Sequence, residues 1–251
     1  MSDSGRAVLE RLKTPQRLAE RHGRQVLVVF DEFQALLGAG QNVDAVFRSE
    51  IQHHGDKIAY VFAGSQPGMM RELFGDRRRP FFDQAAALPL DPLPSPALAE
   101  EIAGRFERTK RDCNEVLGGL LGLAAGHPQR AMQLAAHLWA HTREGEGADG
   151  ATWQATLDSV GREVVEGFRT RWDHLPGGQR RALSALAAGD PPYSVAARER
   201  HGTTTGTTRN ALMRLADDGD VAEDEQSPTG WRLIDPLLAR WIRAGRTWPQ
   251  P

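Results

Sequence analysis

The feature that most constrains the fold is a short apolar run that ends in two acidic residues. Residues 26–30 read VLVVF and lead directly into Asp31 and Glu32. Short runs rich in β-branched residues are typical of strands buried within a parallel sheet. Two carboxylates at the end of such a strand are costly unless a partner or a ligand neutralises them. The pattern therefore predicts a fully buried strand over 25–31, in an α/β fold that places a polar site at the carboxyl end of the strand.

A second apolar segment follows and supports the α/β interpretation. Residues 57–65 read KIAYVFAGS, which predicts another buried strand, ending at Gly64 and Ser65. The segment 86–94, AALPLDPLP, is interpreted as a third strand with its exit loop. Apolar residues at helical spacing predict helices over 5–21, 42–54 and 67–74.

The acidic pair has the chemistry of a magnesium and water site. Mg²⁺ favours one or two carboxylates together with water, so Asp31 would hold the hydrated cation. Glu32 would polarise an attacking water molecule. The alternative is that the pair only caps the following helix, over 33–37. Gln34 and Gln52 could also face the site, or they could be solvated.

The loop that normally binds a triphosphate beside such a site is missing from the sequence. The pattern G-x-x-x-x-G-K-[ST] needs a lysine, and the chain has only three lysines. Lys13 is followed by Thr14, but Leu12 and Ala7 stand where the two glycines should be. Without a loop of backbone N–H groups around the phosphates, the main source of triphosphate affinity is absent. We therefore expect this chain to be the C-terminal part of a nucleotide-binding protein, truncated or naturally without its first lobe.

The remainder of the chain is predicted to be largely helical. Ser95 and Pro96 have the residue types of an N-cap and of a first helical position. The segment 141–150, HTREGEGADG, is polar and glycine-rich and is interpreted as a linker. A two-stranded element is expected at 220–234. Helices are expected over 96–110, 112–124, 128–142, 151–173, 180–188 and 195–200 and within 203–221.

Taken in order, these segments resemble the prokaryotic AAA-type and STAND-type P-loop ATPases. The residues that carry the resemblance are the DEFQ sequence from Asp31, which matches a Walker B motif, the Gly64–Ser65 strand end, the GHPQ sequence from Gly126, and the DPLLARW sequence from Asp235. The resemblance implies a partial parallel-sheet P-loop NTPase core over 1–94. It also implies an all-helical lid over 95–145, and a linker helix with a winged-helix domain over 146–251.

The resemblance also implies roles for particular residues. Ser65 matches the sensor-1 position, which places the attacking water beside the γ-phosphate; the alternative is a simple turn. One of Arg77, Arg78 and Arg79 would supply an arginine finger, unless the three only form a charged surface loop. The motif at the opening of the helix over 128–142 would touch the nucleotide, or would be a plain helical corner. Its residues are Gly126, Pro128, Gln129 and Arg130.

The winged-helix interpretation raises the question of DNA binding. Candidate groove contacts are Thr208, Arg209, Asn210 and Arg214. Six carboxylates crowd the tip that follows, and they oppose the phosphate neutralisation on which DNA affinity depends. They are Asp217, Asp218, Asp220, Glu223, Asp224 and Glu225. We therefore favour a winged helix that contacts protein or packs on itself.

Composition narrows the class of partner. A net charge of −2 gives no bulk attraction to nucleic acid. The single cysteine, Cys113, excludes an internal disulfide and a cysteine-based metal site, and a cytoplasmic location is expected. No apolar run is long enough to cross a membrane. Four tryptophans on apolar faces are predicted to lie in the core, namely Trp139, Trp153, Trp231 and Trp241.

Two functions stay open from the sequence. In the first, the chain is the C-terminal portion of an ATP-driven switch, in which Asp31, Glu32 and Ser65 would be catalytic and ATP and Mg²⁺ would be the cofactors of the intact parent. In the second, it is a non-catalytic module that binds DNA or protein through its winged helix. The sequence does not identify the biological process, the partner or the oligomeric state.

Overall fold

The computed structural model describes residues 9–40, 42–88 and 90–249. Its contacts divide the chain into two compact units, each with a hydrophobic core of its own. The first extends to Leu88 and the second begins after it, with the short segment 217–219 grouped with the first.

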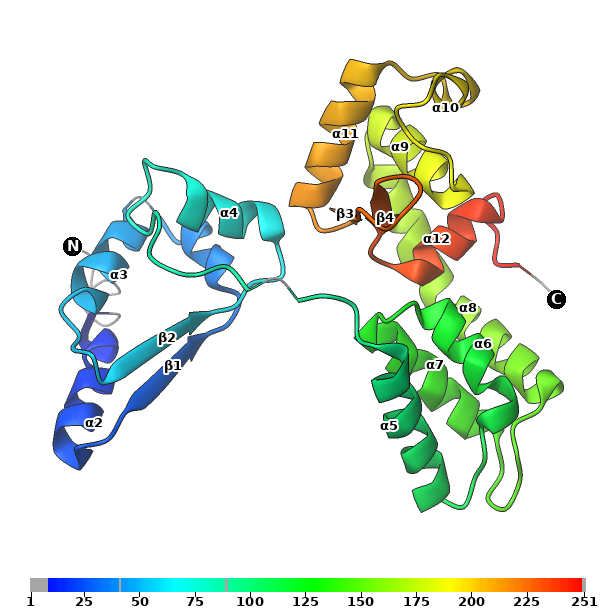
Figure 1. Ribbon diagram of the computed structural model, residues 1–251, viewed down its shortest axis with the longest axis horizontal. Helices are drawn as coiled ribbons and strands as arrows, with labels where there is room; N and C mark the ends of the chain where they lie inside the picture. The colour runs from blue at the N-terminus through cyan, green and yellow to red at the C-terminus, as the bar shows by residue number, and fades with distance from the viewer. Residues whose placement is uncertain (1–8, 41, 89, 250–251) are drawn as a thin grey trace. The chain divides into compact units, whose positions relative to one another are not determined.

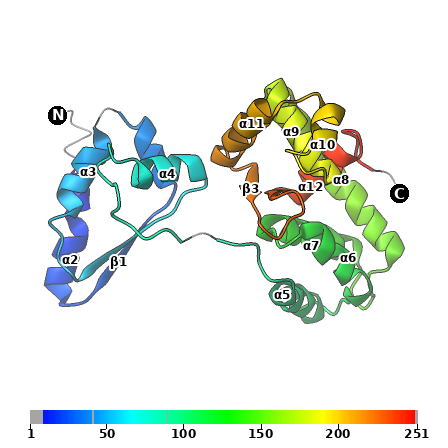
Figure 2. The ribbon, with the colours of Figure 1, turned by 45° about the horizontal axis from the view of Figure 1, so that its top comes forward.

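The first unit is built on two parallel strands joined by a helical crossover. Strands β1 (Val26–Phe30) and β2 (Ile58–Phe62) pair in register from Val26 opposite Ile58 to Phe30 opposite Phe62. Between them lie the 3₁₀ helix η1 (Phe33–Gly38) and helix α3 (Val43–Ile51), because parallel neighbours need a crossover connection. Helices α2 (Thr14–His22) and α3 lie on the same side of the two strands (Figures 1 and 2). Helix α4 (Pro67–Gly75) follows β2.

The two strands bury only one of their faces. Phe30 and Phe62 stack on each other and pack against a cluster centred on Phe33, Leu73 and Phe81. The opposite face is exposed: Leu27 is 63% exposed, and Val29 and Val61 are exposed as well. The prediction of fully buried strands is therefore wrong for the described residues, because these residues cover only one face of the two strands.

Two predicted elements of this region differ in the structure. The segment 86–94 forms no strand among its described residues, and Leu90 is 88% exposed. Pro92 and Pro94 lack the N–H group that strand pairing requires, which explains the wrong prediction. The helix predicted over 5–21 is interrupted at Lys13, immediately before α2 and its Pro15. Residues 5–8 of that prediction lie outside the described residues.

The second unit contains helices and one small antiparallel ribbon. Strands β3 (Val221–Glu223) and β4 (Trp231–Leu233) pair in the ribbon. The helices are α5 (Ser95–Arg108), α6 (Asn114–Ala124), α7 (Pro128–His141), α8 (Gly150–His174), α9 (Gly177–Ala188), α10 (Val195–His201), α11 (Thr205–Asp217) and α12 (Pro236–Arg243). None of the helices among the described residues is long and apolar enough to span a bilayer.

Helix limits in this unit follow local capping chemistry. Asp149 and Ser194 accept hydrogen bonds from the first turns of α8 and α10, as N-caps do. Gly189 and Gly202 end α9 and α10 in the left-handed conformation. Ser95 is the first residue of α5 and makes no capping bond, since Pro94 occupies the N-cap position. The predicted cap at Ser95 is therefore wrong by one residue.

One hydrophobic core joins the helices of this unit. It extends from Leu98 in α5 to Ile242 in α12. Trp241, Leu183 and Leu212 are among its fully buried side chains. The boundary that the sequence places between residues 145 and 146 thus falls inside a unit with a shared core.

Candidate functional site

The ends of β1 and β2 bring together residues that are far apart in the sequence. Strand pairing continues past the two strands, because Ala63 N–H donates to the carbonyl of Phe30 at 2.8 Å. Phe33 N–H then donates to the carbonyl of Ala63 at 2.9 Å. These two bonds place Glu32, which follows β1, beside Ser65, which follows β2.

Three side chains form a hydrogen-bonded cluster at this edge of the sheet. Ser65 Oγ donates to Glu32 Oε2 at 2.9 Å. Gln34 Nε2 donates to the same Glu32 oxygen and to Ser65 Oγ, the latter at 3.2 Å. Gln34 is only 3% exposed, whereas Glu32 and Ser65 face solvent. The buried amide therefore holds the exposed carboxylate and hydroxyl in a set orientation.

The backbone around the cluster is specialised. Glu32 adopts the left-handed conformation, with φ of 50°, which is uncommon for a residue with a side chain. Its N–H donates to Asp31 Oδ1 at 2.9 Å. A Cβ atom at Gly64 would lie 2.4 Å from Gln34 Oε1 and 2.6 Å from the sulfur of Met70. A side chain at residue 64 would therefore displace Gln34 or Met70 from its present position.

The donor set fits a hard cation that keeps much of its water. Asp31 and Glu32 are exposed carboxylates on consecutive residues at the end of a parallel strand. The described ranges contain no group of three or more His, Cys, Asp or Glu residues that could enclose a metal ion. Mg²⁺ is usually held by one or two carboxylates, with water and phosphate oxygens completing its shell. The residues present are compatible with that arrangement and not with an all-protein metal cage.

Gln34 is the site residue for which the sequence offered no decision. The position of Gln34, two residues after Glu32, left open whether its side chain faced the site or the solvent. In the structure Gln34 is buried and donates hydrogen bonds to both Glu32 and Ser65. Gln52, its counterpart in that hypothesis, is exposed and donates to the nearby carbonyl of Ser49. The spacing alone could not separate the two glutamines.

The arginine cluster is already engaged by carboxylates of its own unit. Arg78 makes several hydrogen bonds to Asp76, one of them at 2.7 Å, and they lower the pKa of that carboxyl group to about 2. Arg79 contacts Asp44 at 3.3 Å and also pairs with Glu72. Within the described residues Arg77 has no such carboxylate partner and lies 6.0 Å from the centre of the Phe82 ring. Arg77 is thus the member of the cluster that is available to another molecule.

The opening of α7 combines a tight turn with a side-chain cap. Gly126 has φ of 76°, and a Cβ atom there would lie 2.7 Å from Pro92 Cβ. Arg130 N–H donates to His127 Nδ1 at 3.4 Å, so His127 is the N-cap of α7. Burial is the main cause that lowers the pKa of His127 from its usual value. A neutral ring is what accepting this hydrogen bond requires.

The remaining candidates at this helix opening differ in accessibility. Pro128 and Gln129 are both exposed at the first turn of α7. The guanidinium group of Arg130 is instead paired with Asp235, through contacts of 3.1 and 2.5 Å, and donates to Gln133 at 2.7 Å. Arg130 therefore links α7 to the start of α12, and its guanidinium donors are used within the unit.

The proposed DNA contacts are only partly accessible. Thr208 is 2% exposed and faces the core, so its prediction as a DNA contact is wrong; helical periodicity puts it on the same side as Leu212 and Leu215. Arg209, Asn210 and Arg214 are exposed on α11.

Two of the carboxylates around the ribbon have basic partners in the second unit. Asp220 accepts from Arg171 Nε at 3.2 Å, and Asp224 lies 3.9 Å from Arg232. The sequence shows no basic residue at the tip itself, because these arginines come from α8 and β4.

Comparison with known proteins gives a match in structure alone. No protein-family model matches the sequence, and no curated protein matches it significantly. Among solved structures, the chain is similar to a Walker-type ATPase of Pyrococcus abyssi, with a TM-score of 0.71 and 18% sequence identity. The match covers 94% of this chain and 67% of that protein. The chain therefore has a fold related to that of a Walker-type ATPase.

Proposed function

We propose that this chain is the C-terminal portion of an ATP-binding switch of the AAA or STAND type, in which Asp31, Glu32 and Ser65 form part of the hydrolytic site. The observation that carries the proposal is the cluster of Glu32, Ser65 and Gln34 at the carboxyl ends of two neighbouring parallel strands. Ligands of open α/β sheets bind at that edge. The similarity of this fold to that of a Walker-type ATPase supports the proposal that the chain derives from an ATPase.

Each residue has a role that its geometry permits. Asp31 would hold Mg²⁺, which when bound supplies positive charge to a triphosphate. Glu32 would accept a proton from an attacking water molecule, because its carboxylate is exposed and oriented by two donors. Ser65 and Gln34 would keep that carboxylate in position. The left-handed backbone at Glu32 supports this assignment, since such conformations are frequent at functional sites.

The phosphate-binding loop would come from polypeptide outside this sequence. The chain contains no G-x-x-x-x-G-K-[ST] pattern. The exposed apolar face of β1 and β2, with Leu27, Val29 and Val61, supports an additional α/β layer, because parallel sheets are normally covered on both faces. On its own the chain would bind ATP poorly.

The second unit would carry the helical lid over 95–145 and the winged helix over 146–251. The order of α9, α10, α11, β3, β4 and α12 supports a winged helix. Gly126, Pro128 and Gln129 would contact the nucleotide, and Arg130 would hold the lid to α12. Arg77 is the best placed candidate for an arginine finger. A cytoplasmic location fits the single buried cysteine, Cys113.

The test compares this chain with a longer form whose reading frame extends upstream through a glycine-rich GK[ST] loop. This chain alone should show no rise in melting temperature with Mg–ATP. In the longer form, Glu32→Gln should lower the hydrolysis rate roughly 100-fold or more while ATP binding persists. The matched control is Glu20→Gln, an exposed glutamate of α2. Hydrolysis unchanged by Glu32→Gln, or an upstream frame without such a loop, would refute the proposal.

The alternative is a non-catalytic module that binds DNA or protein through α11. The exposed side chains of Arg209, Asn210 and Arg214 favour it. Under that function, a gel-shift on duplex DNA at ~50 mM salt should show binding that Arg209→Ala with Arg214→Ala abolishes. Substitution of Arg77 and Arg78, which lie in the first unit, is the control. Absence of any shift at that salt concentration would exclude DNA as the partner.

A further inference from the structure

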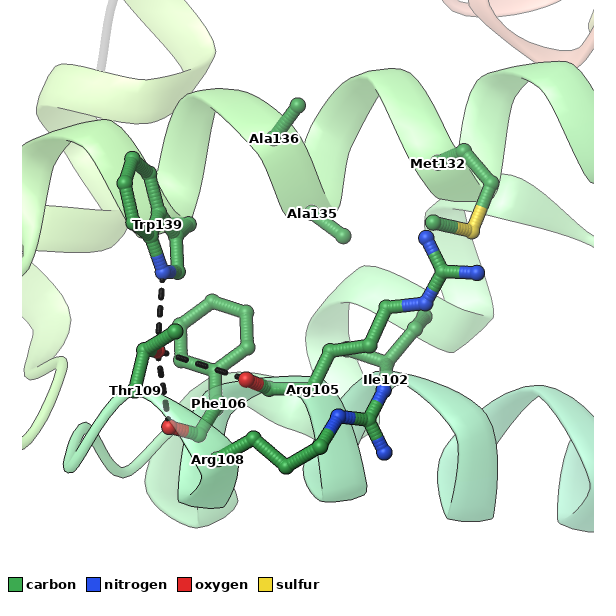
Figure 3. Close-up of a pocket in the computed structure, with 9 residues that line it drawn as sticks. All are labelled: Ile102, Arg105, Phe106, Arg108, Thr109, Met132, Ala135, Ala136 and Trp139. Atoms are coloured by element: carbon green, nitrogen blue, oxygen red, sulfur yellow. Dashed lines mark hydrogen bonds between the residues drawn. The ribbon is translucent and has the colours of Figure 1, made fainter.

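A groove lies between α5 and α7, wholly within the second unit (Figure 3). Its volume is about 450 Å³. Helix α5 and the residue after it line the groove with Ile102, Arg105, Phe106 and Thr109, which follow the spacing i, i+3, i+4 and i+7 of one helical face. Ile102 and Phe106 are buried and form part of the apolar floor.

Helix α7 forms the other wall with the same spacing. Met132, Ala135, Ala136 and Trp139 line the groove, and the two alanines leave room between the larger side chains at either end. Seven residues of helix rise about 10 Å, so the groove is about two helical turns long. Its floor is therefore suited to the apolar ridge of another helix, and the flexible Met132 can adapt to different side chains.

Trp139 is an aromatic side chain that is both exposed and held in place. It is 41% exposed, so the prediction that it lies in the core is wrong. Its indole Nε1 donates to Thr109 Oγ1 at 2.9 Å, and the guanidinium carbon of Arg111 lies 4.2 Å from its ring centre. Thr109 Oγ1 in turn donates to the carbonyl of Phe106 at 2.9 Å. A tryptophan fixed before binding loses little entropy when a partner packs on it.

The rim of the groove is basic on one side and carries no carboxylate on the other. Arg105 and Arg108 line it from α5. Arg105 is paired with Glu101 at 2.5 Å, whereas Arg108 has no ion pair among the residues that the structure describes. The α7 sequence, PQRAMQLAAHLWAH, contains no Asp or Glu. A partner with acidic side chains beside its apolar ridge would be complementary in charge.

We propose that this groove binds an amphipathic helix of a partner protein, which inserts an apolar ridge between α5 and α7 and presents acidic residues to Arg105 and Arg108. The apolar floor suits leucine-like side chains, and the length matches an i, i+3 or i+4, i+7 set of anchors. The groove shares no residue with the proposed nucleotide site.

The experiment selects peptides from a random display library on the full chain, with Ala136→Glu as the counter-selection target. Selected sequences should place apolar residues at i, i+3 or i+4, and i+7, with Asp or Glu beside them. Their affinity, measured by fluorescence anisotropy of labelled peptides, should weaken about tenfold or more with Trp139→Ala and with Ala136→Glu. Arg108→Glu should weaken it roughly three-fold to tenfold, and added salt should weaken binding to the parent chain.

Matched controls separate lost contact from lost folding. Ala140→Glu is the same substitution on an exposed position of α7 that does not line the groove, and Arg162→Glu is an exposed charge reversal on α8. Both should bind like the parent chain, and all variants should keep its circular dichroism spectrum. No enrichment, enrichment of basic peptides, or equal loss with Ala136→Glu and Ala140→Glu would overturn the proposal. The proposal would also be overturned if the groove bound a second copy of this chain or duplex DNA instead. Ala136→Glu would then abolish that binding, and acidic peptides would not compete with it.

Discussion

Gly64 shows how one missing side chain permits the cluster at the strand ends. An added Cβ would lie within 2.4 Å of Gln34 Oε1. Gly64→Ala should therefore lower the free energy of unfolding of the first unit by about 1–3 kcal/mol, because the site cannot expand without displacing Gln34 or Met70. Urea denaturation measures this. Gly55→Ala is the control, since no atom lies within 4 Å of that added Cβ; an equal effect of both substitutions would contradict the argument.

His127 is a residue whose protonation should affect stability. Its pKa is lowered mainly by burial and further by Arg130, while Asp235 raises it. In the unfolded chain His127 takes up a proton near the ordinary histidine pKa of about 6.5, whereas the folded protein keeps the ring neutral to lower pH. Below about pH 6.5 the unfolded state therefore binds more protons than the folded state, and the free energy of unfolding falls as the pH drops. The melting temperature should therefore fall between about pH 7 and pH 5.

The variant His127→Asn isolates this contribution. Asparagine can still accept the capping hydrogen bond of α7 but does not titrate. Its melting temperature should fall less between the two pH values than that of the parent chain. Identical pH dependence in both proteins would assign the effect to other groups.

At the scale of elements, Asp235 joins two helices and starts one of them. It pairs with Arg130 of α7 and also accepts from Leu237 N–H at 3.0 Å and Leu238 N–H at 3.3 Å. Asp235→Ala removes both the cap and the ion pair, so it should cost about 2–4 kcal/mol in chemical denaturation. Asp235→Asn keeps the cap and should cost less.

An exposed ion pair in the same unit provides the comparison. Arg169 and Glu166 on α8 lie 3.7 Å apart with exposed side chains, so Glu166→Ala should change the unfolding free energy by less than about 0.5 kcal/mol. If Asp235→Ala were equally mild, the Arg130–Asp235 link between α7 and the start of α12 would not stabilise the unit.

At the scale of the whole molecule, the residues that the structure describes form two separate hydrophobic cores of unequal size. The first is centred on Phe33, Leu73 and Phe81, and the second includes Leu98 through Ile242. Calorimetry should therefore resolve two transitions, the first unit melting at the lower temperature. Leu73→Ala should shift only the lower one and Leu183→Ala only the upper one, each by a core cavity cost of about 2–5 kcal/mol. One transition that moves with both substitutions would contradict this.

Local patterns in the sequence determined most of the elements. The apolar run of β1 and the apolar spacing of α5 through α8 each depend on neighbours only a few positions away. For that reason their type and approximate limits could be predicted. The strand predicted over 86–94 is wrong for a reason that is also local, because Pro92 and Pro94 cannot donate the hydrogen bonds of a strand.

What only the tertiary structure decided is which residues meet across long separations. It brought Ser65 and Gln34 to Glu32, paired Arg130 with Asp235, and left Trp139 exposed beside Thr109. Periodicity identifies an apolar face of a helix or strand, but it does not identify the element that covers that face, or whether any element does. That choice depends on packing over the whole chain, which local residue preferences do not encode.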